Sequence, residues 1–141
     1  MSEPVHATCV AIGGRGVLIR GRSGSGKSDL ALRLIDRGAR LVSDDYTLLS
    51  AHEGRVRARP PETIAGKLEV RGVGIVEMEP EADIPICLIA DLDWTAERLP
   101  EAARGVAILG IPIPAIGIAA LEASAPLKLE QALLRFGLKL P

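Results

Sequence analysis

The stretch that most constrains the fold of this chain is Gly21–Ser28, which fits the pattern G-x-x-x-x-G-K-[ST] of a phosphate-binding P-loop. Gly24 and Gly26 can adopt backbone angles that are closed to other residues, so successive N–H groups turn inward as an anion nest. Lys27 supplies a positive charge for the β- and γ-phosphates, and Ser28 offers a hydroxyl to Mg²⁺ at the start of a helix. The residues expected to bind a nucleotide are Gly21, Arg22, Ser23, Gly24, Ser25, Gly26, Lys27 and Ser28.

The segments on either side of this loop have the order that a P-loop requires. Arg15–Arg20 is a short apolar run typical of a strand that enters the loop. After the loop, Leu30, Ala31, Leu34 and Ile35 fall on one helical face, and Gly38 is placed to end the helix. This pattern predicts binding of a nucleoside triphosphate and disfavours the alternative, a glycine-rich turn that binds no ligand.

Length and composition indicate the number of domains, the type of core and the class of partner. The 141 residues are 48% apolar with one Tyr, one Trp and one Phe, which predicts a single domain, 1–141, with an aliphatic core. The net charge is −1, and the one basic tract is the alternating arginines of residues 55–59, which are typical of the wet face of a strand. We therefore expect no binding to nucleic acid.

Cysteine usage and hydropathy predict the compartment. Cys9 and Cys87 lie in apolar runs without metal-ligand spacing, so we expect both to be small buried residues in a reducing environment. The first residues show no basic start and no apolar signal core, and no apolar run reaches the roughly 18 residues of a membrane span. These features predict a cytoplasmic protein without membrane association.

A histidine precedes the P-loop strand in a predicted hairpin. Residues 5–12 are rich in β-branched and small side chains, and the glycines of residues 13–16 then reverse the chain. If Gly13 pairs with Gly16, the register places His6 opposite Ser23, beside the bound phosphates. The alternative is that His6 is an exposed residue at a strand end.

Two adjacent acids follow the next predicted strand, Arg40–Ser43. A carboxylate at the tip of a strand next to the P-loop strand can hold Mg²⁺ or activate a nucleophile. Asp44 and Asp45 repel each other, so at least one of them should have a metal or a cationic neighbour. The alternative is a solvated turn that favours aspartate.

The rest of the chain contains more strands than helices. Glu69 and Arg71 lie in a run of strand formers, where they could also be an exposed ion pair. The further predicted elements are a hairpin of residues 46–51 and 55–59, an acidic loop at 77–83, a central strand at 85–92, a strand at 106–113 closed by Pro112 and Pro114, and a helix at 126–136 capped by Ser124, with Leu129, Ala132, Leu133 and Phe136 facing the core. This predicts an α/β fold with a strand-rich mixed sheet, a P-loop helix and a C-terminal helix.

The P-loop, the tandem aspartates and the run Leu68–Ile75 together resemble the C-terminal catalytic domain of bacterial HPr kinase/phosphorylase, a family that acts on a serine of the phosphocarrier protein HPr. The resemblance extends from His6 to Ile75, is looser from Pro85 to Leu99 and is faint beyond. It implies a P-loop kinase core similar to that of phosphoenolpyruvate carboxykinase.

The resemblance also implies roles for individual residues. Lys27 and the rest of the loop would bind ATP, while Ser28 and Glu69, with Asp44 as a further candidate, would hold Mg²⁺. Asp45 would take the proton of the substrate serine, with His6 close by. Arg98 would match a catalytic arginine of the family.

At the level of the whole protein, the resemblance implies a cytoplasmic protein-serine kinase that depends on ATP and Mg²⁺, acts on an HPr-type protein and assembles as a homo-oligomer, namely a hexamer. We expect a short form that starts at the catalytic domain, without the separate N-terminal domain of full-length members. The uncharged run Ile111–Ile118 replaces a basic segment associated with the phosphorylase reaction, which makes that activity doubtful. The alternatives are a small-molecule kinase and a nucleotide-dependent switch that transfers no phosphate.

Overall fold

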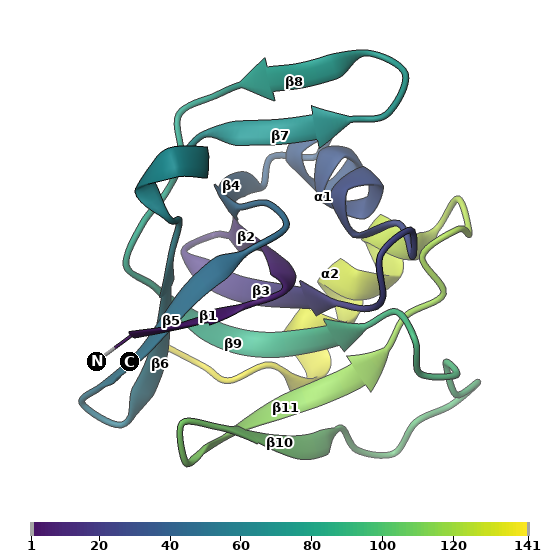
Figure 1. The fold of residues 1–141 in the computed structure, drawn as a ribbon. Coiled ribbons are helices and arrows are strands. Elements are labelled where there is room, and N and C mark those ends of the chain that lie inside the picture. The colour runs from purple at the N-terminus through teal and green to yellow at the C-terminus, as the bar shows by residue number, and fades with distance from the viewer. Residues whose placement is uncertain (1, 141) are drawn as a thin grey trace.

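The computed structural model describes residues 2–140, so the predicted domain bounds extend one residue beyond it at each end. Its helices are α1 (Lys27–Asp36), α2 (Ala125–Phe136) and a short 3₁₀ turn, η1 (Glu62–Ile64). The strands are β1 (Ser2–Val5), β2 (Ala7–Ile12), β3 (Arg15–Arg20), β4 (Arg40–Ser43), β5 (Thr47–His52), β6 (Arg55–Arg59), β7 (Lys67–Val70), β8 (Gly74–Glu77), β9 (Ile84–Asp91), β10 (Arg104–Ile108) and β11 (Ile111–Gly117). The predicted strand-rich α/β fold is confirmed (Figure 1).

A curled mixed sheet forms the body of the molecule. Seven of its strands follow the order β1-β5-β6-β9-β3-β2-β4, and β11 joins β9 and carries β10. The P-loop strand β3 is parallel to β9 and antiparallel to β2. Because β9 pairs with β3, β6 and β11, it is central, as predicted. The hairpin of β7 and β8 is a separate two-stranded sheet that lies over α1 (Figure 1).

The two faces of the sheet bury different aliphatic clusters. In β3 the side chains of Val17 and Ile19 pack with α1 and α2, whereas Leu18 points to the opposite face, as the period of a strand requires. That opposite face is closed by the curl of the sheet itself, through strands β5, β6 and β11. Both cysteines are fully buried, as predicted. No helix among residues 2–140 is long and apolar enough to cross a membrane.

The two helices confirm most of their predicted features. Leu30, Ala31 and Leu34 are buried on the inner face of α1, and Gly38 ends it with a φ of +109°, a conformation that suits glycine. Ser124 is the N-cap of α2, but its side chain makes no capping hydrogen bond, and its carbonyl instead accepts from the N–H of Lys128.

The predicted register of the first hairpin was wrong. Gly13 and Gly14, with φ values of +59° and +80°, form a two-residue turn, so Ile12 pairs with Arg15 and the ladder ends at Ala7 and Arg20. Two residues with positive φ are what the tight turn between twisted antiparallel strands requires, and adjacent glycines supply them. His6 therefore lies just beyond the ladder and has no partner in it.

Two further expectations were also wrong. Strand β4 pairs with β2, so Asp44 and Asp45 follow a strand that is separated from β3 by β2. The single strand predicted at 106–113 is instead parts of two antiparallel strands, β10 and β11, and Pro112 and Pro114 lie inside β11, opposite Ala107 and Gly105 of β10. Because β11 pairs with β9 only from Ala115 onward, the prolines occupy a part of the strand with a single neighbour, where a missing N–H is tolerated.

The buried cysteines give a first prediction. Burial raises the pKa of the Cys9 thiol, and also that of Cys87, because the thiolate would lose its hydration. Since the thiolate is the reactive form, we expect iodoacetamide at mildly alkaline pH to leave both cysteines unmodified in the native protein and to modify both in urea. Mass spectrometry of the intact chain measures this, and rapid alkylation of native Cys9 would contradict the packing of β2.

Candidate active site

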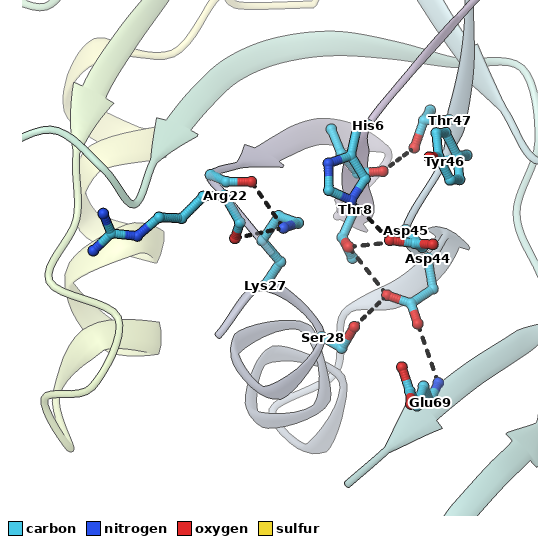
Figure 2. Close-up of polar contacts among 12 residues, drawn as sticks. His6, Thr8, Arg22, Lys27, Ser28, Asp44, Asp45, Tyr46, Thr47 and Glu69 are labelled. Carbon is cyan, nitrogen blue, oxygen red and sulfur yellow. Dashed lines mark hydrogen bonds and ion pairs between the residues drawn. The ribbon is translucent and has the colours of Figure 1, made fainter. Parts of the chain in front are cut away.

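The P-loop folds into a ring that is closed by its own lysine. Gly24 and Gly26 have φ values of +82° and +99°, and the N–H of Ser25 donates to the carbonyl of Arg22. The Nζ of Lys27 donates to the carbonyls of Gly21, at 2.8 Å, and Arg22, at 3.0 Å (Figure 2). With only 7% of Lys27 exposed, the loop holds this side chain in place without a ligand.

A turn after β9 anchors the entrance of the loop. The N–H of Arg22 donates to Asp93 Oδ2 at 2.9 Å, and the Nε of Arg20 donates to the buried Asp91 at 2.6 Å. Trp94 follows in the same turn and contacts the guanidinium groups of Arg20 and Arg104. Sequence reasoning missed this anchor, although Asp93, an acid directly after the predicted central strand 85–92, was a usable signal.

Asp44 is the buried centre of the site, with 5% exposure. Its Oδ1 accepts hydrogen bonds from the hydroxyls of Ser28, at 2.6 Å, and Thr8, at 3.0 Å. Its Oδ2 accepts from the backbone N–H of Glu69 at 3.1 Å (Figure 2). Thr8 was missed from the sequence, although it lies two residues after His6 in the predicted strand 5–12, where the period of a strand would place both on one face.

Asp45 points away from Asp44 toward His6. Its φ of +69° turns the side chain outward, where the Nε2 of His6 lies 2.9 Å from Oδ1. An ionised carboxylate only accepts hydrogen bonds, so Nε2 is the donor. The ring of His6 also lies 5.2 Å from that of Tyr46. The adjacent acids thus avoid repulsion by having separate partners, and Asp45 keeps a side chain that is 62% exposed.

These groups surround one cleft of about 470 Å³. Most of the predicted site residues line it, whereas Asp29, Leu32, Val70, Arg71 and Leu121 were not predicted as site residues. The lining residues are His6, Ser23, Gly24, Gly26, Lys27, Ser28, Asp29, Leu32, Asp45, Glu69, Val70, Arg71 and Leu121. Gly21, Arg22, Ser25 and Asp44 are predicted site residues that do not line the cleft. Arg98 is exposed in the loop between β9 and β10 and is not among the lining residues, so its catalytic role remains a prediction.

Oxygen donors for a metal are present beside the loop. Within residues 2–140, no group of three or more His, Cys, Asp and Glu side chains is arranged to hold a metal ion. Mg²⁺ in phosphoryl-transfer sites commonly uses one or two carboxylates together with the phosphates of the substrate. The hydroxyl of Ser28 and the carboxylates of Asp44 and Glu69 fit that type of site.

The strand β3, the loop closed by Lys27 and the helix α1 define the P-loop class of phosphate-binding proteins. Comparison with known sequences gives the family. Residues 1–127 match the HPr Serine kinase C-terminal domain, and the chain belongs to this family.

Individual relatives agree with this assignment. The chain is 35% identical over 127 residues to HPr kinase/phosphorylase of Streptococcus thermophilus, which covers 81% of this chain and 41% of that protein. It is 46% identical over 74 residues to HPr kinase/phosphorylase of Clostridium beijerinckii, which covers 52% of this chain and 24% of that protein. The chain therefore spans less than half the length of these relatives.

A solved structure shows the same fold. The Hpr(Ser) kinase/phosphatase from Coxiella burnetii superimposes with a TM-score of 0.83 and 28% sequence identity, covering 94% of this chain and 95% of that one. The expected resemblance to the HPr kinase family, and the P-loop kinase fold that it implied, are confirmed.

The different environments of the two acids predict different effects on stability. Asp44→Asn replaces one accepting oxygen with an NH₂ group that cannot accept, so we expect a loss of about 1–3 kcal/mol in the free energy of unfolding. Asp45→Asn changes an exposed side chain and should stay within about 0.5 kcal/mol of the wild type. Urea unfolding measures both. An Asp44→Asn variant as stable as Asp45→Asn would refute the buried network.

Proposed function

We propose that this domain transfers the γ-phosphoryl group of ATP to a serine hydroxyl of an HPr-type carrier protein. The observation that carries this proposal is that Lys27 of the P-loop and Asp45, paired with His6, face the same cleft. Membership of the HPr Serine kinase C-terminal domain family supports the choice of reaction and substrate. We also infer a homo-oligomeric cytoplasmic enzyme, as the family resemblance implies.

The phosphate-binding half of the mechanism rests on the loop. Its inward N–H groups and Lys27 stabilise the negative charge that develops on the transferred phosphoryl group. Ser28, Asp44 and Glu69 would hold Mg²⁺, which neutralises phosphate charge when it is bound. Because Asp44 already holds the hydroxyl of Ser28, the oxygens of these two residues are oriented before any ligand arrives.

The proton-accepting half rests on Asp45. We infer that one oxygen of its exposed carboxylate takes the proton of the incoming serine hydroxyl, while the other is held by His6. His6 thereby fixes the orientation of the carboxylate. The exposed position of Asp45 suits a base that must meet a side chain on another folded protein.

The reverse reaction should be weak. Phosphorolysis brings inorganic phosphate and phosphoserine together, and an additional cation would reduce their repulsion. The uncharged run Ile111–Ile118 includes the whole of β11 and offers no such cation. Arg98, which the resemblance places at the phosphoryl group, would offset this repulsion only in part.

The direct test is phosphotransfer to purified HPr-type protein. With labelled ATP and Mg²⁺ we expect one labelled serine, identified by mass spectrometry.

Lys27→Ala should weaken ATP binding and abolish transfer together, because the charge of Lys27 acts on both the bound and the reacting phosphates. Transfer by Lys27→Ala at a tenth of the wild-type rate would refute this role. In a parallel incubation of the protein and labelled ATP with cell-derived small molecules and proteins, a labelled metabolite would indicate a small-molecule kinase, and no labelled product would indicate a nucleotide switch.

A second variant isolates the base. Asp45→Asn keeps the shape of the side chain and removes its basicity, so transfer should fall by about 10²-fold or more while ATP affinity changes little. Single-turnover kinetics and equilibrium binding measure the two quantities separately. A loss of ATP binding, or a rate near that of the wild type, would show that Asp45 is not the base.

A further inference from the structure

An exposed leucine lies at the edge of the candidate active-site cleft. Leu121 is 88% exposed and lines the cleft together with Asp29 and Leu32. A Cβ built on Gly26 of the P-loop would lie 3.8 Å from Leu121 Cδ2. An apolar side chain in water is unfavourable. A ligand that extends from the phosphate loop along this edge would cover it.

The turn that carries Leu121 is held against α1. The guanidinium of Arg33 donates to the carbonyls of Ala120 and, at 3.1 Å, Glu122, the residues on either side of Leu121. Arg33 also pairs with Asp29 at 3.1 Å. Ala120 itself is buried, so the backbone under Leu121 is anchored on both sides. The leucine is therefore presented to the cleft by a fixed turn.

Leu121 and the proposed base lie on opposite sides of the P-loop strand. Strand β3 lies between β2 and β9. His6 precedes β2, and Asp45 follows β4, which pairs with β2. Leu121 follows β11, which pairs with β9. The cleft thus runs from the Asp45 side, across the loop, to the Leu121 side.

The order of groups in a nucleoside triphosphate indicates which end of the cleft would hold the γ-phosphate and which end the nucleoside. In a P-loop the amides cradle the α- and β-phosphates and the lysine reaches the β- and γ-phosphates. If the γ-phosphate faces Asp45, the nucleoside leaves the loop on the opposite side. Leu121 lies there, Leu32 lines the same cleft, and nucleobases offer flat apolar faces that pack well on aliphatic side chains.

We propose that Leu121 and Leu32 form the subsite for the nucleoside of the bound triphosphate, with Arg33 as the positioning residue for Leu121. This inference rests on the proposed function, since it takes the transferred phosphate to lie at Asp45. It assigns the base and ribose to a face made of the turn after β11 and the first turns of α1.

The test compares ATP with inorganic tripolyphosphate, which has the phosphates without the nucleoside. Calorimetric titration in the presence of Mg²⁺ gives the dissociation constant of each ligand. We expect Leu121→Ser to weaken ATP binding about fivefold or more and to leave tripolyphosphate binding unchanged. Leu121→Met keeps the apolar bulk and should bind ATP as the wild type does. Leu134→Ser, at a 67% exposed leucine of α2 outside the cleft, is the matched control and should change neither.

Three results would overturn the subsite. Unchanged ATP affinity in Leu121→Ser would show that the nucleoside lies elsewhere, even if transfer to the protein substrate were slower. Equal weakening of ATP and tripolyphosphate would show that Leu121 only shapes the phosphate loop. Equal affinity of the wild type for both ligands would show that no nucleoside subsite exists. If the wild type binds neither ligand, the proposed function fails first, which separates the two failures.

Discussion

The buried carboxylate of Asp44 joins the parts of this molecule that must act together. Its oxygens accept hydrogen bonds from the helix that follows the P-loop, from the strand after His6 and from the hairpin that carries Glu69. These donors are neutral, so the charge of Asp44 is stabilised by dipoles rather than by an ion pair. The hairpin of β7 and β8 is outside the main sheet, and this bond ties it to the phosphate loop.

Much of the fold could be predicted from local patterns. The glycine loop with its flanking strand and helix is specified within residues 15–38, where spacing and backbone freedom act over short distances. The pairing of β4 with β2 could not be predicted in the same way. An apolar strand such as β4 can be buried equally well beside β3 or beside β2, so its composition does not select the neighbour. The prolines of β11 were misjudged for a related reason. Whether a proline ends a strand depends on how many neighbours the strand has, which is a tertiary property.

In the candidate site, too, features set by local sequence were predicted and features set by tertiary contacts were not. Lys27, Ser28, Asp45 and Glu69 were predicted from motif and family resemblance, and all four line the cleft. Thr8 and Asp93 were missed because they act through contacts with residues far away in the chain. Leu121 was missed because an exposed leucine in a loop has no sequence signature. The sequence thus predicts residues that line the cleft better than the residues that hold them in place.

The ring formed by Lys27 affects how tightly a ligand can bind. A free lysine side chain loses roughly 1.5–2 kcal/mol of conformational entropy when it is immobilised. Here the carbonyls of Gly21 and Arg22 immobilise it during folding, so an arriving phosphate does not bear that loss. The entropy cost of ordering Lys27 is therefore met during folding, and the affinity of the loop for an anion is higher by that amount.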